Sequence, residues 1–203
     1  MEAVDDVPTA SVSTLSQADA QRIANAYVTT NLDPAFEVVP DTHTHRQVRE
    51  PARWRFFVRC ADGPVTTLYV DAQTGAVIPL TPDEIRIVRE KAAILTARRQ
   101  GVLPVDAQGY VLGEYARRRA DAYLGDQIAM FFNAADPLFV PGDPPRWQVT
   151  IVFKRYHRGP FTLGVMDVNA HTGEVLPLSK SQLKRIRERA HALVEFQTQT
   201  AAA

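Results

Sequence analysis

The chain of 203 residues contains a single cysteine, Cys60. One cysteine cannot form a disulfide within the chain, and it excludes a CxxC metal or redox motif. Lysine and arginine together number 23, and aspartate and glutamate also number 23, so the formal net charge is zero. A balanced charge argues against a nucleic-acid binder that depends on bulk positive charge. We therefore expect neither a disulfide framework nor a nucleic-acid partner.

Long hydrophobic runs and enzyme motifs are also missing. No stretch approaches the roughly 18 apolar residues of a membrane span, and residues 1–13 are acidic and lack the apolar segment of a signal peptide. We therefore expect a cytoplasmic protein without membrane partners. The sequence also lacks a glycine-rich phosphate loop and the HExxH, GxSxG and Walker motifs. These absences predict a protein that is not an enzyme and has no cofactor or metal.

What the sequence does contain is an internal repeat. Residues 70–80, VDAQTGAVIPL, return as residues 168–178, VNAHTGEVLPL, at an offset of 98. Trp54 corresponds to Trp147 at an offset of 93, so the second copy has five extra residues between the tryptophan and the Thr-Gly pair. We expect these five residues in a hairpin loop. A repeat of this length indicates two copies of a small domain.

Each copy has the pattern of an α-β-β-β-α unit. The strands led by Trp54 and Trp147 alternate apolar and polar residues with period two, as a strand with one face on a core does. Capping boxes, TPDE at residues 81–84 and SKSQ at residues 179–182, begin the last helix of each copy. The other expected elements are helices over residues 16–32 and 112–132, strands over 66–71 and 162–169, and a short strand over 76–80. An extra strand within residues 36–45 or 138–140 is left open.

The predicted fold class is α+β, with two tandem α-β-β-β-α units, each a small antiparallel sheet packed against helices. The residues expected in the cores are Trp54, Phe56, Val58, Trp147, Val149 and Ile151, near Tyr27 and Tyr123. Cys60 occupies the position of Phe153 and is interpreted as an apolar core residue. The predicted segments are a disordered arm at residues 1–13, a first repeat at 14–100, a linker at 101–109, a second repeat at 110–197 and a tail at 198–203.

The order of helix, Trp-led strand, hairpin and Val-Asp-Ala-x-Thr-Gly-x-Val resembles the PepSY family. The D-x-x-T-G-x-V signature of that family is carried by Asp71, Thr74, Gly75 and Val77, and in the second copy by Asn169, Thr172, Gly173 and Val175. The resemblance covers most of each repeat, with asparagine replacing aspartate in the second. It implies helices on a small antiparallel sheet, and a link to propeptides of thermolysin-like proteases and to peptidase inhibition. Some intracellular immunity-type proteins show a similar pattern.

The resemblance implies a non-catalytic protein-binding or inhibitory module with a peptidase or toxin as its partner. The alternative is a structural, scaffold or immunity-type protein that self-associates, and a homodimer is left open. Shared positions are explained by the fold, so function is expected where the copies differ. The hairpin of the second copy differs most, and its exposed tip is predicted to contact an acidic protein surface or a phosphate, unless it is an ordinary solvated loop. The tip residues are Arg155, Tyr156, His157 and Arg158.

Two further groups have simpler interpretations. Asp41, His43 and His45 would share one face of a strand as metal ligands do, but no supporting ligands stand at a suitable spacing, which favours a solvated loop. The last helix of each copy has a basic face opposite its apolar stripe, which is typical of a solvated surface.

Overall fold

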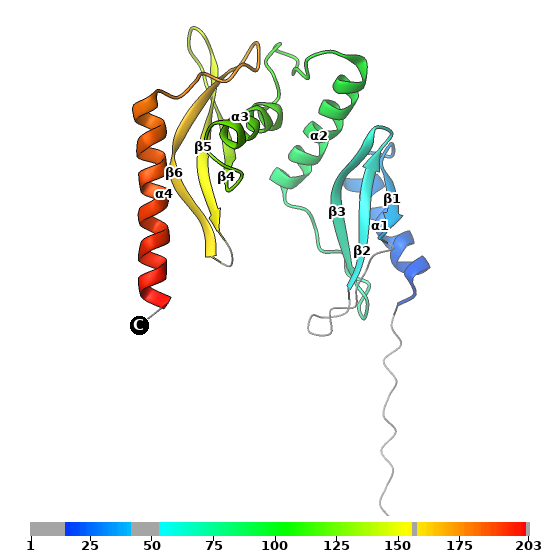
Figure 1. Cartoon of the computed structure of the whole chain (residues 1–203). Coiled ribbons are helices and arrows are strands. Elements are labelled where there is room, and N and C mark those ends of the chain that lie inside the picture. Colours follow the sequence, from blue (N-terminus) through cyan, green and yellow to red (C-terminus); the bar gives the residue numbers. More distant parts are fainter. Residues whose placement is uncertain (1–14, 42–52, 156–157, 202–203) are drawn as a thin grey trace, which may run out of the picture. The chain divides into compact units, whose positions relative to one another are not determined.

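The computed structural model describes residues 15–41, 53–155 and 158–201 (Figure 1). The pattern of contacts divides the chain into unit 1, Met1–Ala92, and unit 2, Ala93–Ala203. Unit 1 contains α1 (Gln17–Asn31), β1 (Glu37–Pro40), β2 (Arg53–Cys60) and β3 (Gly63–Asp71). Helix α2 (Pro82–Gln100) begins in unit 1 and crosses the division. Unit 2 contains α3 (Gly113–Gln127), β4 (Phe132–Val140), β5 (Arg146–Arg155), β6 (Arg158–Asn169) and α4 (Lys180–Ala201).

Each unit contains one antiparallel sheet, and its strands lie in chain order. The sheets are β1-β2-β3 and β4-β5-β6. Helix α1 lies against all three strands of its sheet, and α3 does the same in unit 2 (Figure 1). The predicted α+β class and the antiparallel sheets packed against helices are therefore confirmed. None of the helices within the described residues has the length and apolar character needed to cross a membrane.

The core of unit 1 lies between α1 and the sheet. Ser16 caps α1, because its hydroxyl accepts a hydrogen bond from the backbone N–H of Asp19 at 3.2 Å. Ala20, Ala24 and Val28 follow at four-residue spacing and are buried on one face of the helix. The sheet residues buried in this unit include Phe56, Val58, Leu68 and Val70. Small helix residues facing large strand residues let the helix approach the sheet closely.

Unit 2 has a core of the same kind. Ala116, Ala120 and Leu124 repeat the four-residue spacing on α3 and are fully buried. Ile186 and Ala190 of α4 join the same cluster. The strands contribute Val149, Ile151, Phe153, Met166 and Val168 to it. Helices α3 and α4 therefore share one apolar core with the sheet.

The two tryptophans are half-buried, which corrects the prediction that they are core residues. Phe56, Val58, Val149 and Ile151 are buried as predicted. The indole Nε1–H of Trp54 donates to the carbonyl of Leu15 at 3.0 Å, and that of Trp147 donates to Val111 at 2.8 Å. An indole needs a hydrogen-bond partner for its N–H, so each ring lies at the edge of the core, where a carbonyl before the helix is available.

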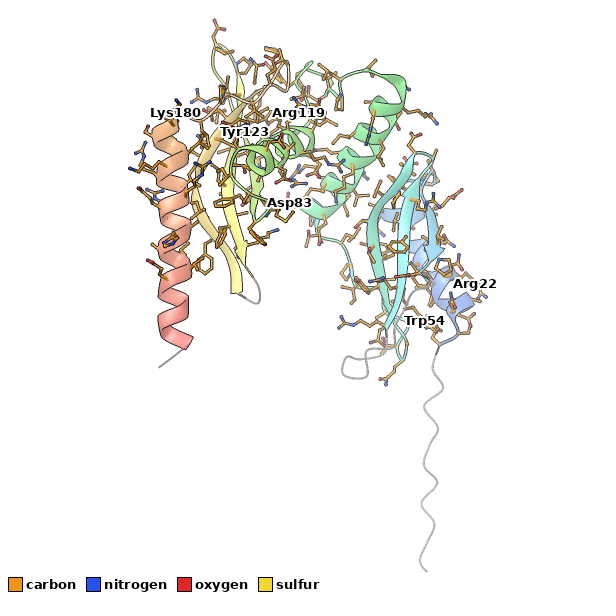
Figure 2. The ribbon with its side chains drawn as sticks, viewed as in Figure 1. Arg22, Trp54, Asp83, Arg119, Tyr123 and Lys180 are labelled. Carbon is orange, nitrogen blue, oxygen red and sulfur yellow. The ribbon has the colours of Figure 1, made fainter. Side chains whose placement is uncertain are left out.

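A second equivalent bond joins the first helix to the segment before the last helix. The hydroxyl of Tyr27 accepts from the N–H of Leu80 at 2.8 Å, and the hydroxyl of Tyr123, which is labelled in Figure 2, accepts from the N–H of Leu178 at 3.0 Å. The two tyrosines therefore fix where the chain leaves the sheet. The order of helices and strands and these bonds are the same in both units.

The strand expected over residues 76–80 is absent, which is a second correction. The Thr-Gly turn forms as expected, and Gly75 has a positive φ of 74°. After it, the chain makes one isolated bridge, between Val70 and Val77. The N–H of Ile78 still donates to the carbonyl of Tyr69 at 2.9 Å, but the N–H of Leu80 donates to the hydroxyl of Tyr27 instead of to β3, so the segment leaves the sheet. The third strand of each sheet is instead β1, within residues 36–45 where an extra strand was left open, or β4, which includes residues 138–140 but begins already at Phe132.

The five extra residues of the second copy lengthen strands instead of widening a loop. In unit 1, Trp54 pairs with Val70 and the last pair of the hairpin is Cys60 with Gly63. In unit 2, Trp147 pairs with Val168 and the last pair is Arg155 with Arg158. Register shifts along β5 and β6 absorb the odd residues. The hairpin of unit 2 is therefore longer, and two residues separate its last paired residues, as in unit 1.

Candidate functional site

The hairpin end of unit 2 is where the two units differ most. The predicted tip is only partly described: the backbones of Arg155 and Arg158 pair at the end of β5 and β6, while Tyr156 and His157 lie outside the described residues. The contact of this tip with a partner stays a prediction. Lys154, one residue before the pair, is exposed.

Two large apolar side chains are exposed beside this hairpin end. The N–H of Lys154 donates to the carbonyl of Phe131 at 3.1 Å, which places the connection between α3 and β4 next to the end of β5. In that connection the exposed fraction of Met130 is 81% and that of Phe131 is 47%. The next residue, Phe132, is 8% exposed, and its ring lies 5.3 Å from that of Phe153. Consecutive residues therefore present one apolar surface to solvent and another to the core.

An open apolar pocket of about 240 Å³ lies at the same end of unit 2. It is lined by Ile128, Phe132, Phe153, Arg187, Ala190, His191 and Val194. Arg187 is held there because its guanidinium donates to the carbonyl of Gln127, at the end of α3, at 2.7 Å. His191 Nδ1 lies 3.4 Å from a carboxylate oxygen of Glu195. We call Met130, Phe131, Lys154 and this pocket the hairpin-end surface.

Unit 1 has smaller side chains at the corresponding positions. Phe36 and Phe132 correspond, because each donates its N–H at 3.1 Å to the carbonyl three residues earlier. Pro34 and Ala35 then stand where unit 2 has Met130 and Phe131, and Cys60 stands where it has Phe153. Arg89 corresponds to Arg187 and also donates to carbonyls at the end of the first helix. The arginine that donates to these carbonyls is therefore common to both units, whereas the large apolar residues occur in unit 2.

No known protein matches this chain in a scan against protein-family models, a search of curated proteins or a search of solved structures. The resemblance to the PepSY family therefore rests on the sequence pattern alone. What this surface does must be argued from its own chemistry.

The exposed apolar pair was not among the residues selected from the sequence. Residues 112–132 were expected to form one helix, but α3 ends at Gln127. Met130, Phe131 and Phe132 are three consecutive apolar residues, and such a run does not fit one face of a helix. Pro34 at the corresponding place in unit 1 is a further sign that the helix ends before it. Together these two signals could have located the surface.

A buried ion network in unit 2 is structural. Glu114 is 3% exposed and accepts hydrogen bonds from Arg117 at 2.7 Å and from Arg118 at 3.1 Å. Burial alone would raise the pKa of Glu114, but the hydrogen bonds and charges of Arg117 and Arg118 outweigh it and lower that pKa. Arg117 also pairs with Asp121, whose other oxygen accepts from the N–H of Ala134 in β4. These paired charges fasten α3 to β4.

Asp41, for which the sequence favoured a solvated loop over a metal site, is buried, with an exposed fraction of 3%. The carboxylate of Asp41 pairs with the guanidinium of Arg55, and His43 and His45 lie outside the described residues. The hydrogen bond with Asp41 raises the pKa of Arg55 above its ordinary value. Among the residues that the structure describes, no three His, Cys, Asp or Glu side chains are placed to hold a metal ion.

The basic helix faces carry ion pairs within each helix. In α2, Arg86 bonds to Glu90 at 2.7 Å and lies 3.6 Å from Asp83. In α4, Lys184 lies 3.7 Å from Glu188. Such pairs partly neutralise an exposed face, as on an ordinary solvated helix. These faces are therefore weaker candidates than the hairpin-end surface.

Proposed function

We propose that this chain is a non-catalytic protein-binding module, built from two PepSY-like units, that binds its partner through the hairpin-end surface of unit 2. The observation that carries the proposal is the exposure of Met130 and Phe131 at the end of unit 2 that also holds an apolar pocket. Methionine and aromatic residues are enriched in the centres of protein interfaces. Clustered exposed apolar surface is unfavourable in water and marks interaction sites.

The size of the pocket supports a protein partner over a small-molecule substrate. Its volume of about 240 Å³ is below the roughly 300–1,000 Å³ of pockets that enclose drug-sized ligands. The two titratable side chains of its lining are engaged, Arg187 with Gln127 and His191 with Glu195. This arrangement is suited to holding an apolar group against a surface.

The edges of both sheets disfavour binding by strand addition. Every edge strand contains a proline: Pro40 in β1, Pro64 in β3, Pro137 in β4 and Pro160 in β6. A proline offers no N–H, and prolines on edge strands protect a sheet against pairing with another chain. The partner is therefore expected to contact side chains instead of extending a sheet.

Self-association is the second candidate function, and a different surface favours it. Leu138 on β4 is 62% exposed and Val165 on β6 is 49% exposed. A second copy could cover these side chains, as the scaffold interpretation requires. Sedimentation velocity of the wild type and of Leu138→Ser distinguishes this function, because it predicts a dimer that dissociates in the variant.

The test of the main proposal is a comparison of variants in a pull-down from the native host with mass spectrometry. Met130→Ser and Phe131→Ala together remove the exposed apolar pair, and Leu138→Ser is the matched control because it removes a similar exposed side chain elsewhere in unit 2. We expect the double variant to lose a partner that the wild type and the control retain, with unchanged thermal melting. Retention of every specific partner by the double variant would refute the proposal.

A further inference from the structure

The sheet of unit 2 exposes apolar side chains on the face opposite its helices. Helices α3 and α4 share the core on the other face. On the face away from them, Leu138 is 62% exposed and Val165 is 49% exposed. Leu138 pairs with Gln148 and Val165 pairs with Thr150, both on the central strand β5. We call this surface, from Gln148 to Lys154 on β5 with the residues paired to them on β4 and β6, the open sheet face.

The corresponding face of unit 1 carries arginines at its centre. At the offset of 93, Arg55 corresponds to Gln148 and Arg59 corresponds to Val152. Arg59 is exposed, whereas Val152 is 5% exposed. Like charges placed opposite one another oppose the packing of a sheet on its own copy. Unit 2 therefore lacks the two central cations that would prevent its sheet from meeting itself.

The two ends of the open sheet face carry charges of opposite sign. Lys154 follows the core residue Phe153 along β5, so its side chain lies on the open sheet face, where it is exposed and forms no ion pair with the described residues. At the other end, Asp167 pairs with Gln148, and its side chain is 30% exposed. Its Oδ2 lies 3.5 Å from Nε of Arg146, and its Oδ1 has no hydrogen-bond partner among the described residues. Each copy thus offers one unpaired cation and one carboxylate that is only partly satisfied.

We propose that the open sheet face binds the same face of a second copy, with the strands of the two copies antiparallel. A two-fold axis that is perpendicular to the strands at the level of Ile151 brings Lys154 of one copy to the level of Gln148 and Asp167 of the other, because positions 154 and 148 are equally distant from 151. A parallel arrangement would instead place each Lys154 opposite its own copy. This inference rests on the second candidate function, self-association, and specifies its surface and orientation.

A second copy fits because one face supplies both the apolar and the charged groups that the other needs. Each contact occurs twice in a two-fold dimer, so the exposed leucine, the exposed valine and the ion pair all count double. From Arg146 to Lys154 the face is roughly 26 Å long, and its three strands make it roughly 14 Å wide. This size is at the small end of specific interfaces. We therefore expect a weak dimer, with a Kd of about 10 µM.

The experiment is sedimentation velocity of the full chain and of two charge-reversal variants, from about 1 µM to about 200 µM. Lys154→Glu and Asp167→Lys should each weaken the dimer about tenfold or more, because each places like charges opposite one another at both ends of the interface. An equimolar mixture of the two variants should form dimers again, because each new charge then faces its opposite. A mixture that dimerises no better than its components would overturn the inference.

Apolar variants and matched controls locate the interface independently of the charges. Leu138→Ser and Val165→Ser should each weaken the dimer about tenfold with unchanged thermal melting. Val102→Ser is the apolar control, because Val102 is 56% exposed in the segment between α2 and α3. Lys180→Glu is the charge control, because Lys180 is an exposed lysine at the first residue of α4 (Figure 2). Equal weakening by the controls and by the face variants would contradict the inference.

The failure of this inference differs from the failure of the proposed functions. A wild type that stays monomeric at every concentration refutes self-association and this inference together. A dimer that survives Leu138→Ser, Val165→Ser and both charge reversals supports self-association but refutes the open sheet face. The hairpin-end proposal is tested separately, because Met130→Ser/Phe131→Ala should lose the host partner and still dimerise.

Discussion

Replacing Gly173 with alanine tests the close packing of the Thr-Gly turn against α3. Gly173 has a φ of 70°, a left-handed conformation that costs a residue with a side chain about 1–2 kcal/mol. A Cβ atom there would lie 2.7 Å from Cε1 and 3.3 Å from Cδ1 of Tyr115. An aromatic ring moves as a rigid body, so relieving this overlap costs a further ~1–3 kcal/mol. We expect Gly173→Ala to lower the free energy of unfolding of unit 2 by about 2–5 kcal/mol.

Gly75 in unit 1 provides the matched control. Its φ is 74°, so the backbone cost of alanine is the same. Its Cβ would lie 3.3 Å from Cδ1 of Ile23, the end of a flexible side chain that can shift by a few tenths of an ångström. We therefore expect Gly75→Ala to cost only about 1–2 kcal/mol. The ring contact should account for the difference of about 1–3 kcal/mol between the two variants.

The assay is urea-dependent hydrogen exchange with mass spectrometry, because peptides from each unit report its unfolding separately. Tyr115→Ala removes the ring, so combining it with Gly173→Ala should cost less than the sum of the single changes by about 1 kcal/mol or more. Equal costs of Gly75→Ala and Gly173→Ala would refute the packing argument. Strict additivity of Gly173→Ala with Tyr115→Ala would do the same.

Two other changes have defined expected outcomes. Trp147→Phe keeps an aromatic ring but removes the donor to the Val111 carbonyl, so the free energy of unfolding should fall by about 1 kcal/mol, measured by urea titration; an unchanged midpoint would contradict this. The backbone N–H groups of Thr74 and Gln73 lower the pKa of Asp71 below its ordinary 3.8, so this carboxylate stabilises the fold above that pH, and the stabilisation is lost as pH falls through the lower folded pKa. Asp71→Asn should therefore reduce the acid-induced loss of stability below about pH 4; an identical loss in both proteins would count against it.

The features predicted best from the sequence are those fixed by local bonds. The expected capping boxes form, because Thr81 and Glu84 exchange hydrogen bonds at the start of α2, and Ser179 and Gln182 do so at the start of α4. Two residues three positions apart can form these hydrogen bonds regardless of how the rest of the chain folds. The fold class follows from such local signals together with period-two strands.

The features predicted less well depend on partners that are distant in sequence. The apolar character of residues 76–80 is compatible with a strand, but strand formation requires continued pairing, which ends because the N–H of Leu80 donates to the distant Tyr27 hydroxyl. The alternation of β2 places Trp54 on the core face, but it does not reveal that the carbonyl of Leu15 draws the indole to the edge of the core. The pocket depends on three separate segments of unit 2, so no single motif in the sequence marks it.

The positions of the equivalent bonds explain why the hairpin end can vary between the units. Trp147 precedes Phe153 by six residues along β5, which is roughly 20 Å at about 3.3 Å per residue. The bond of Trp147 therefore holds the unit at the opposite end of the sheet. At the hairpin end both units share the arginine of the last helix, and it binds backbone carbonyls that do not depend on neighbouring side chains. Unit 2 has Phe153 where unit 1 has Cys60, and its hairpin is longer. These differences change the surface at the hairpin end but leave the hydrogen bonds that both units share unchanged. This is the pattern expected when one unit carries a binding surface that the other lacks.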